Sequence, residues 1–421
     1  MALFDQISEM ITKEKIGEES TYTPSYSSGI DVMDYRNGRI DGNEVNVGFD
    51  GGRIITVIGK SGSGKTSLAI KIACSAVNSY EDGNIFHYDF ERATNDSRVK
   101  TISGWDDKTL AKKYKRLDRN IYSESIYSLV KGIDQIKNDP ETYDKIKVDS
   151  GRTDSNGNPI YTLPPTVILI DSWALMMPKD ISEEEKLSGS MSATSIAKVN
   201  NSIIKRIVGP LERANIMLII INHITQKIEI NPFAKTQAAI NYLKQDESIP
   251  GGTSFLYLSN NIIRVTTSSK LEEKDLYGIK GFMVKGEFVK SRSNEAGRQF
   301  EMVFEQSTGF DNVLTNLANF KELGLLKGSP RAYFLEDCPD IKFTLRTFKE
   351  KYEESEELQE TVKKLVKEHY IDFIPGSGNI EESNEEEIEI ELVKCVNKKQ
   401  DIWLGSDGNY YNSDFEELDV E

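Results

Sequence analysis

The sequence predicts an α/β fold built around a doubly wound, mostly parallel β-sheet. Three runs of β-branched and aliphatic residues, at 54–58, 166–170 and 216–221, each have the length of a buried strand. Helical patterns separate these runs, and glycine or polar residues follow each of them directly. Strands that alternate with helices form parallel sheets covered on both faces, and such sheets bind ligands beyond the carboxyl ends of their strands. We therefore expect the functional residues at those strand ends.

A glycine-rich turn after the first of these runs gives the strongest local signal in the chain. Gly59, Gly64, Lys65 and Thr66 have the G-x-x-x-x-G-K-[ST] spacing of a phosphate-binding loop. The backbone N–H groups of such a loop point at a phosphate, and the positive end of the following helix adds to the attraction. We expect Lys65 to reach the β- and γ-phosphates and Thr66 to ligate Mg²⁺. The predicted nucleotide-binding residues are Gly59, Lys60, Ser61, Gly62, Ser63, Gly64, Lys65, Thr66 and Ser67.

Polar residues at three further strand ends are predicted to converge on the same crevice. Asp171 closes an apolar run, which is where an acid associated with Mg²⁺ is expected. Glu91 ends a strand at 85–90, and its carboxylate would orient and deprotonate the attacking water. His223 follows another strand and would hydrogen-bond the γ-phosphate. The plainer alternatives are a turn aspartate, an exposed glutamate and a histidine without that role.

The distribution of charge matters more than its total. A net charge of −16 alone would speak against a nucleic-acid partner. However, residues 350–421 hold 22 Asp and Glu residues against 7 Lys residues, so the rest of the chain is close to neutral. A near-neutral core can still present a basic face locally. The acidic end is interpreted either as a mimic of nucleic acid that occupies a basic groove or as a solvated tail.

Cysteine usage and hydropathy predict a cytoplasmic protein without membrane contact. Cys74, Cys338 and Cys395 are far apart and provide neither a disulfide framework nor the spacing of zinc ligands, which fits a reducing compartment. No apolar run approaches the ~20 residues that cross a bilayer. The first residues lack the basic and apolar regions of a secretory signal.

Several segments depart from simple strand–helix alternation. The pattern of residues 1–28 predicts a helix followed by a polar connector. This segment is expected to be either a solvated arm or an arm that packs on a neighbouring subunit. A turn-rich stretch at 145–165 predicts an inserted β-hairpin. The polar segment 224–252 exceeds the usual loop length, so it is functional or disordered. We further expect helices at 106–118, 124–138 and 193–208, strands within 253–306, helices across 311–370, and a short strand pair at 389–396 and 401–404.

Six blocks follow one another in an order that is typical of a known family. They are 51–54 leading into 59–66, then 88–91, 168–172, 221–223, 251–254 and 289–292. In this order they resemble the RecA family of recombinases, and most closely its phage branch, the UvsX-like proteins. The phosphate loop alone occurs in many families, whereas the combination is far more specific. The resemblance covers about residues 29–335.

The resemblance implies a domain organisation and cofactors. A RecA-like ATPase core would span residues 29–310 and use ATP and Mg²⁺. Residues 1–28 would be an oligomerisation arm. A small helical region would follow at 311–374, and residues 375–421 would form the acidic tail.

The resemblance also implies roles for single residues. Glu91 matches the position of the family's catalytic carboxylate, and Asp171 matches that of its Mg²⁺-linked acid. His223 matches the position of the residue that senses the γ-phosphate. Lys290 and Arg292 match two cations that reach across a filament interface to the neighbour's γ-phosphate, where they would stabilise transition-state charge. Without the family, these two would be ordinary strand-edge charges.

Two segments match the family's DNA-binding loops. The first, at about 179–192, places Met191 where the family wedges a side chain against bases, although the acidic run 183–185 does not suit a phosphate backbone. Lysines neutralise phosphates without reading sequence, while apolar and aromatic side chains contact bases. We therefore assign DNA binding mainly to the second loop, with Lys227, Ile228, Phe233, Lys235, Gly251 and Gly252 as the candidates.

Two departures from the family pattern are evident. Residues 92–98 do not reproduce the tyrosine that stacks on adenine in the family, so base recognition has no assigned residue. The insertion at 145–165 has no counterpart that the resemblance explains.

Three functions remain to be compared. The first is an ATP-dependent protein that forms helical filaments on single-stranded DNA and pairs it with homologous duplex DNA. Its expected partners are a single-strand-binding protein and a recombination mediator. It would act in the cytoplasm, which is that of the host cell if the protein is phage-encoded. The second is a hexameric helicase, disfavoured because Gly59 leaves little room for a preceding collar domain. The third is a non-catalytic, ATP-gated DNA-binding regulator, disfavoured by Glu91 and by the pair Lys290 and Arg292.

Overall fold

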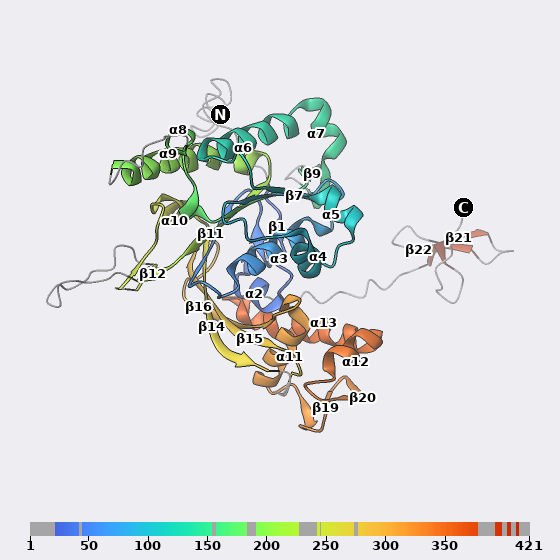
Figure 1. Cartoon of the computed structure of the whole chain (residues 1–421). Helices are drawn as coiled ribbons and strands as arrows, with labels where there is room; N and C mark the ends of the chain where they lie inside the picture. Colours follow the sequence, from blue (N-terminus) through green and yellow to red (C-terminus); the bar gives the residue numbers. More distant parts are fainter. Residues whose placement is uncertain are drawn as a thin grey trace. The chain divides into compact units, whose positions relative to one another are not determined.

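The computed structural model divides the chain into two compact units, Met1–Pro375 and Gly376–Glu421 (Figure 1). The residues it describes are 22–41, 44–153, 157–182, 191–226, 242–244, 246–272 and 277–377, with three short strands after residue 391. The helix and much of the arm predicted within residues 1–28 therefore lie outside the described residues, as does most of the predicted DNA-binding loop.

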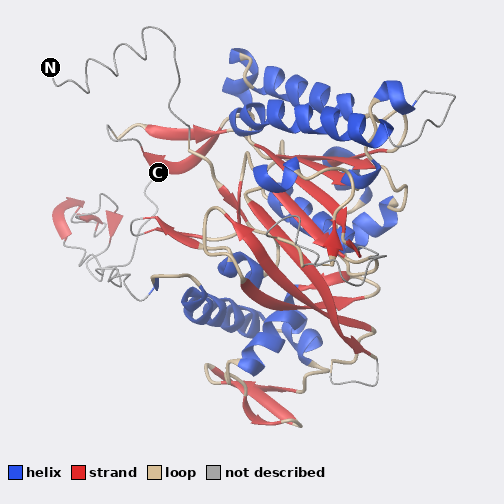
Figure 2. Cartoon of the chain, turned by 90° about the vertical axis from the view of Figure 1, so that its left-hand side faces the viewer, coloured by secondary structure: helices blue, strands red, loops and turns tan. Residues whose placement is uncertain are grey.

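The first unit is organised around a nine-stranded, mostly parallel sheet, so the predicted α/β fold class is confirmed (Figure 2). The strands from β14 through β7 run parallel, and β15, β16 and β17 extend the sheet with antiparallel pairs. In spatial order the strands are β17 (Gly309–Asp311), β16 (Arg298–Glu305), β15 (Gly281–Ser291), β14 (Asn261–Leu271), β5 (Ile54–Gly59), β11 (Ile216–His223), β10 (Thr166–Asp171), β6 (Asn84–Asp89) and β7 (Tyr114–Leu117).

Alternation of side chains along the central strands builds a core on each face of the sheet. In β5, Ile55 and Val57 join one apolar cluster, while Ile54 and Ile58 join the other. Helix α3 (Lys65–Asn78) belongs to the first cluster, whereas α6 (Ser123–Lys137) and α9 (Met191–Arg213) cover the second face side by side (Figure 1). All residues of β5 and β10 are buried, as expected for strands covered on both faces.

The connection from β6 to β7 corrects one prediction. Helix α4 (Asp96–Ser103) is capped by the Asn95 side chain, which accepts from the Arg98 N–H, and α5 (Asp107–Lys113) follows. The predicted helix at 106–118 is wrong beyond Lys113, because Tyr114–Leu117 forms the edge strand β7. Pairing with β6 overrides the local pattern, and the Tyr114 hydroxyl hydrogen-bonds His87 Nδ1 at 2.7 Å.

An antiparallel strand pair occupies the segment where an inserted hairpin was predicted. Helix α7 (Pro140–Ile146) leads into β8 (Val148–Thr153), which pairs with β9 (Pro159–Thr162). Arg152 of β8 forms an ion pair with Glu44 at the start of β3 (Glu44–Asn46). The hairpin therefore contacts the segment that precedes the phosphate-loop strand. That segment contains β1 (Ser25–Tyr26), α2 (Asp31–Arg36), β2 (Arg39–Asp41), β3 and β4 (Phe49–Asp50).

The region predicted as helical after residue 311 also contains a small sheet. Its helices are α11 (Asn312–Glu322), α12 (Phe348–Glu354) and α13 (Glu356–Tyr370), followed by the 3₁₀ turn η2 (Ile371–Phe373). Between α11 and α12 lie β18 (Lys327–Ser329), β19 (Ala332–Leu335) and β20 (Cys338–Phe343). The purely helical prediction is therefore wrong here. Gly328, at φ +90, permits the tight β18–β19 turn, since a Cβ there would lie 2.4 Å from the Ala332 carbonyl.

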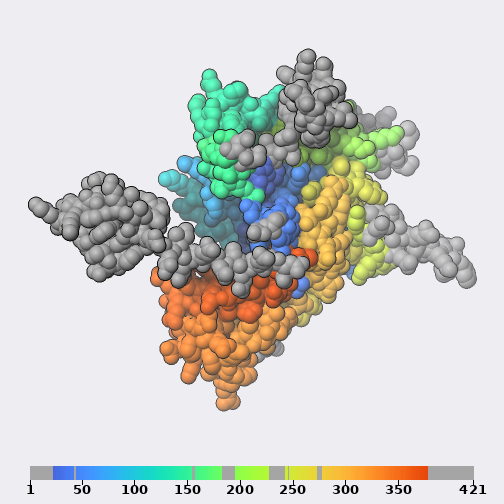
Figure 3. Space-filling model, turned by 180° about the vertical axis from the view of Figure 1, so that it is seen from behind, coloured from blue at the N-terminus to red at the C-terminus, as the bar shows by residue number. Residues whose placement is uncertain are grey.

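This region shares its core with the central sheet. Phe320, Phe348 and Tyr370 belong to the same apolar cluster as Ile55 and Val57. Figure 3 shows the orange surface of the region after residue 311 continuing directly into the yellow surface of the preceding part of the chain. The second unit contains three short antiparallel strands, β21 (Leu392–Asn397), β22 (Ile402–Gly405) and β23 (Tyr410–Tyr411). Among the described residues, no helix combines the length and apolar character that a membrane crossing requires.

Candidate active site

The carboxyl ends of β5, β6, β10 and β11 surround a cavity of about 540 Å³. Of the residues predicted from the sequence, the structure brings nine to its wall: Ser61, Gly62, Gly64, Lys65, Thr66, Ser67, Glu91, Asp171 and His223. Four strands that are separated in the sequence thus end beside the same cavity, because they are parallel and in register.

The phosphate-binding loop has the backbone that its glycines predict. Gly62 and Gly64 have φ angles of +75 and +86, which side-chain-bearing residues rarely adopt. Gly59 lies so close to β14 that a Cβ there would be 2.5 Å from the Val265 carbonyl oxygen. The Lys65 ammonium is buried and donates to the Lys60 carbonyl at 2.8 Å. Burial lowers its pKa, and the Asp171 and Glu91 carboxylates oppose that effect.

Asp171 and Thr66 provide oxygen ligands suited to Mg²⁺. The Thr66 hydroxyl donates to Asp171 Oδ2 at 2.6 Å. Asp171 Oδ1 is buried and has no hydrogen-bond partner among the described residues. Burial raises the pKa of Asp171 to about 6, against a partial lowering by the Thr66 hydrogen bond. A hydroxyl and a carboxylate with an unsatisfied oxygen match the hard-ligand preference of Mg²⁺, which usually takes its remaining ligands from phosphates and water.

The raised pKa of Asp171 leads to a prediction about stability. The folded-state pKa of about 6 lies above the usual aspartate value of 3.8, so ionising this carboxyl destabilises the folded, nucleotide-free protein. That penalty appears as pH rises above about 4 and is complete above about pH 7. We expect Asp171→Asn to raise the free energy of unfolding by about 1–3 kcal/mol at about pH 8, with a smaller gain at about pH 5.

Chemical denaturation of the nucleotide-free protein at both pH values measures this effect. The same variant should lose most of the stabilisation that Mg²⁺ and ATP give to the wild type, because stabilisation by a ligand follows its affinity. A variant that is less stable than wild type at both pH values would contradict the assignment of a destabilising buried carboxylate.

Glu91 is held in place by the backbone of Asp171 and by the side chain of His223. The Phe90 and Glu91 N–H groups both donate to the Asp171 carbonyl, at 2.7 and 3.2 Å. His223 Nε2 lies 2.7 Å from Glu91 Oε1. Burial favours a higher pKa for Glu91, but the hydrogen bond from His223, the nearby Ser172 hydroxyl and the Lys65 charge together hold the pKa below its usual value. Glu91 is therefore a carboxylate at neutral pH.

From His223 the chain runs directly into the segment predicted to bind DNA. Ile224 donates its N–H to the Gly59 carbonyl, and β12 (Thr225–Gln226) then pairs with β13 (Glu247–Ser248). We call β12 and β13 the loop stem. Arg264 Nη1 lies 2.9 Å from both carboxylate oxygens of Glu247, and these side chains are only 11% and 9% exposed. The stem is thus tied to β14, the strand that neighbours the phosphate-loop strand.

Breaking this buried ion pair should loosen the stem. Glu247→Gln leaves the Arg264 guanidinium buried without its charged partner, which costs about 3 kcal/mol or more in comparable pairs. We expect the variant to lower the free energy of unfolding in chemical denaturation. Glu81→Gln is the matched control, since it removes an exposed ion pair with Lys112 and should change stability little. Equal stability of both variants would show that the Arg264 pair does not hold the stem.

Most predicted DNA-binding residues cannot be compared with the structure. Lys227, Ile228, Phe233 and Lys235 lie outside the described residues, and of Met191 only its position at the start of α9 is described. Gly251 and Gly252 lie in a turn with φ angles of +85 and +88. The Gly251 carbonyl accepts a hydrogen bond from Trp173 Nε1 at 2.8 Å, and a Cβ on Gly251 would lie 2.9 Å from Trp173 Cδ1. Their predicted role in DNA binding stays a prediction.

Lys290 and Arg292 do not reach the cavity of their own chain. Arg292 donates its backbone N–H to the carbonyl of Asn260, next to Asn261, which pairs with Ile55 near the start of β5. The cavity lies at the other end of this strand, about 13 Å away along the sheet. Lys290 Nζ donates to the Leu256 and Tyr257 carbonyls of α10 (Ser254–Leu258). Arg292 Nη2 also donates to the Tyr257 carbonyl, at 2.7 Å. Burial, and then the neighbouring Arg292, lower the pKa of Lys290 to about 8.

The cavity also contains residues that no sequence pattern indicated. Arg98 enters from α4, Lys270 and Lys280 from the β14–β15 hairpin, and Phe304 and Gln306 from the end of β16. They lie far apart in the sequence and follow no motif, so only the folded sheet brings them together. Of these residues, Arg98 lies nearest in the sequence to a predicted site residue, since its helix follows Glu91 closely.

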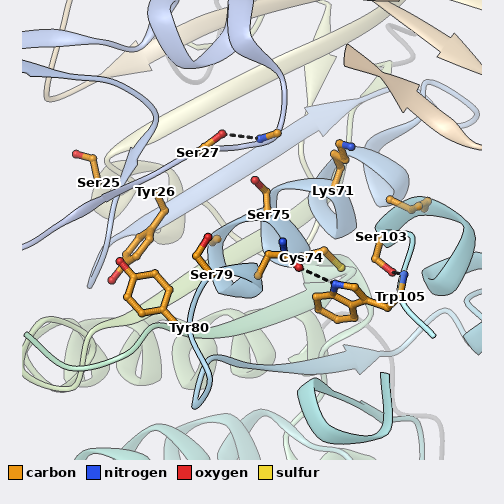
Figure 4. A pocket seen from close by; sticks show the side chains of 14 residues that line it. Ser25, Tyr26, Ser27, Lys71, Cys74, Ser75, Ser79, Tyr80, Ser103 and Trp105 are labelled. Atoms are coloured by element: carbon orange, nitrogen blue, oxygen red, sulfur yellow. Dashed lines mark hydrogen bonds between the residues drawn. The ribbon is translucent and has the colours of Figure 1, made fainter. Parts of the chain in front are cut away.

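A second cavity, of about 380 Å³, lies beside the middle and end of α3 (Figure 4). Its wall includes Lys71, Cys74, Tyr80 and Trp105, and Trp105 Nε1 donates to Asn78 Oδ1. Burial raises the pKa of the Cys74 thiol to about 12, so this sulfur is not a nucleophile at neutral pH. No residue of the phosphate loop lines this cavity, and the predicted site residues are absent from its wall.

Comparison with known proteins supports one family. No protein-family model matches the chain. Similar curated proteins include RecA of Aquifex pyrophilus, 24% identical over 292 residues, and RecA of Aquifex aeolicus (strain VF5), 24% identical over 289 residues. These matches cover 68% and 66% of this chain and 68% of each relative. RecA of Acholeplasma laidlawii (strain PG-8A) is 23% identical over 240 residues, which cover 55% of this chain and 56% of the relative.

These matches support the RecA family. At this level of identity the support extends to the family and not to a single branch of it. The RecA-like order of the sequence blocks and the nine-stranded sheet agree with the same conclusion.

Proposed function

We propose that this RecA-like protein, of the phage UvsX type, is an ATP-dependent recombinase that forms filaments on single-stranded DNA. The observation that carries the proposal is an asymmetry of the structure. The residues predicted to bind phosphate and metal and to activate water line one cavity, whereas the predicted charge-stabilising cations Lys290 and Arg292 lie at the opposite end of the strands. A site divided in this way is completed by a second copy of the chain.

Within one subunit, different residues of the cavity have different roles in ATP hydrolysis. The loop N–H groups and Lys65 would hold the phosphates. Thr66 and Asp171 would hold Mg²⁺, which would neutralise phosphate charge. Glu91 accepts a proton from the attacking water, a step that its lowered pKa permits at neutral pH. His223 keeps one Glu91 oxygen occupied, so the carboxylate is oriented before a substrate arrives.

Across the subunit interface, Lys290 and Arg292 would stabilise the charge that develops on the neighbour's γ-phosphate. DNA binding by the 224–252 loop would align neighbouring subunits, so that the cations of one subunit face the nucleotide of the next. His223 would then link DNA binding to ATP hydrolysis, since the chain passes from it directly into the loop stem. Base pairing between single-stranded DNA and homologous duplex supplies sequence specificity, so the protein needs only backbone and stacking contacts.

The partners follow from this activity. We propose a single-strand-binding protein that prepares the DNA, a mediator that loads the filament, and the host cytoplasm as the compartment. The arm before residue 29 would contribute to subunit contacts, and the acidic end would compete with duplex DNA for a basic groove.

The decisive experiment measures ATP hydrolysis with and without single-stranded DNA and examines the same samples by electron microscopy. A recombinase gives DNA-stimulated hydrolysis together with helical filaments. Closed rings would favour the hexameric helicase, and binding of ATP without turnover would favour the regulator. Either of these two results would overturn the proposal.

A further inference from the structure

The inserted hairpin is joined to the segment before the phosphate-loop strand by a series of hydrogen bonds. Arg152 of β8 donates through Nη2 to the side-chain oxygen of Asn46 at 3.2 Å, and Asn46 donates to Asp41 at 3.0 Å. Arg39 bridges two carboxylates, since its Nε lies 2.9 Å from Asp41 Oδ2 and its Nη1 lies 2.7 Å from Asp50 Oδ1. We call these five residues the insertion network. They lie on β8, β3, β2 and β4, outside the nine-stranded sheet.

Asp50 connects the insertion network to Arg292, a predicted cation of the subunit interface. Its second carboxylate oxygen, Oδ2, accepts a hydrogen bond from the Ser293 hydroxyl at 2.9 Å. Ser293 directly follows Arg292 in the turn between β15 and β16. The side chain of Asp50 is only 15% exposed, so solvent screens its contacts less than at an exposed site. A continuous polar path therefore runs from the inserted hairpin to the residue beside Arg292.

A β-bulge in the hairpin determines where the Arg152 side chain lies. The register of β8 and β9 shifts between Asp149 and Arg152, and Gly151 has a φ of +71. An extra residue of this kind twists a strand and redirects its side chains. Arg152 forms an ion pair with Glu44, and its Cζ lies 4.4 Å from the ring centroid of Tyr22. The bulged strand thus places one guanidinium against two other segments of the chain.

Arg292 itself is held only by neutral groups among the described residues. Its backbone N–H donates to the Asn260 carbonyl at 2.9 Å, and its Nη2 donates to the Tyr257 carbonyl at 2.7 Å. No carboxylate of the described part of the chain forms an ion pair with it. The position of this cation therefore depends on the backbone of its turn, and the bond from Ser293 to Asp50 fixes that turn.

We propose that the insertion network positions Arg292 for catalysis in the neighbouring subunit, with Ser293 and Asp50 as the positioning residues next to it. The inference rests on the proposed function, because it requires that Arg292 act across the subunit interface. A group that stabilises a transition state must be placed accurately, and a displacement of about 1 Å can lower the rate about 100-fold. The network gives the hairpin at 145–165 a role that the resemblance to known recombinases does not supply.

Other roles for the same network make different predictions. A network that only stabilises the fold would change the melting temperature and leave the rate per folded subunit unchanged. A network that shaped the nucleotide cavity of its own chain would change the affinity of the isolated subunit for ATP. A positioning role instead lowers kcat, while the KM for ATP and the affinity of the isolated subunit stay near those of wild type.

The test measures steady-state ATP hydrolysis by the full chain with saturating single-stranded DNA. Ser293→Ala should lower kcat about 10- to 100-fold, because it releases the turn from Asp50, and KM should stay within about twofold. Ser293→Thr keeps the hydroxyl and should retain most of the rate. Arg152→Ala, at the far end of the network, should lower kcat about 2- to 30-fold. Lys147→Ala is the matched control, since its ion pair with Asp144 lies beside the hairpin but outside the network.

Mixing variants shows whether the defect lies in the cation that a subunit supplies. Ser293→Ala keeps its own Glu91, whereas Glu91→Gln keeps the intact network and Arg292. About a quarter of the interfaces in an equal mixture join an intact Glu91 to a correctly placed Arg292, so about a quarter of the wild-type rate should return. Ser293→Ala mixed with Arg292→Ala contains no correctly placed Arg292, and this mixture should be no more active than the average of its components.

The opposite pattern, recovery with Arg292→Ala and none with Glu91→Gln, would place the defect in the variant's own nucleotide site and overturn the inference. A wild-type kcat in Ser293→Ala would overturn it as well, and a wild-type kcat in Arg152→Ala would remove the hairpin from it. Failure of the proposed function is distinguishable, because Arg292→Ala would then retain DNA-stimulated hydrolysis.

Discussion

Replacing Glu91 with glutamine should lower the rate of ATP hydrolysis by about 100-fold or more while leaving ATP binding nearly unchanged. Glutamine keeps the size of the side chain and a hydrogen bond to His223, but it cannot accept a proton from water. The phosphate contacts lie in the loop and at Asp171, so they are not altered. Steady-state hydrolysis with saturating single-stranded DNA, alongside calorimetric ATP binding, measures both parts of the prediction.

The same variant should hold filaments on DNA for longer, because we propose that ATP hydrolysis releases the filament from DNA. Glu141→Gln is the control, since this exposed glutamate of α7 does not line the cavity. Hydrolysis by Glu91→Gln at the wild-type rate would show that another group accepts the proton.

Replacing Arg292 with alanine should abolish DNA-stimulated hydrolysis, with an expected loss of about 1,000-fold if it acts as a cation supplied to the neighbour. Nucleotide binding by the isolated subunit should remain, because Arg292 lies at the opposite end of the sheet from its own cavity. Measuring both the rate on DNA and the affinity of the subunit without DNA separates these effects.

A loss of folding would imitate this result, since Arg292 also holds the Tyr257 carbonyl. The melting temperature and the nucleotide affinity of the variant therefore need to match those of wild type. Lys285→Ala provides a control on the same strand, at an exposed position away from both ends. DNA-stimulated hydrolysis that survives in Arg292→Ala would exclude this arginine from the catalytic centre.

The glycine-rich loop of the candidate site could be predicted because its conformation depends on contiguous sequence. Gly59, Gly64, Lys65 and Thr66 form one turn whose glycine positions have a steric reason. Asp171 and His223 could be anticipated for a different reason, since buried parallel strands present their terminal residues at one sheet edge. The hydrogen bond between Glu91 and His223 was not anticipated, because it depends on the exact spacing of β6 and β11 around β10.

The part of the cavity wall that α4 and β16 contribute could not be predicted in the same way. Arg98 and Phe304 become neighbours only when β16 is placed beside β15 and α4 packs nearby. The edge strand β7 and the small β18–β20 sheet were missed for a related reason. Their residues gain their conformation from pairing with other strands, which overrides the helical pattern of the local sequence.

The central claim is that two copies of the chain complete one catalytic centre, and mixing two inactive variants tests it directly. Glu91→Gln retains the cations that it would give to a neighbour, whereas Arg292→Ala retains its own carboxylate. In a head-to-tail assembly of equal amounts, about a quarter of the interfaces would combine an intact Glu91 with an intact Arg292. Mixing either variant with the double variant creates no such interface, which provides the control. The account predicts that the mixture of single variants regains about a quarter of the wild-type DNA-stimulated rate, and a mixture no more active than its separate components would contradict it.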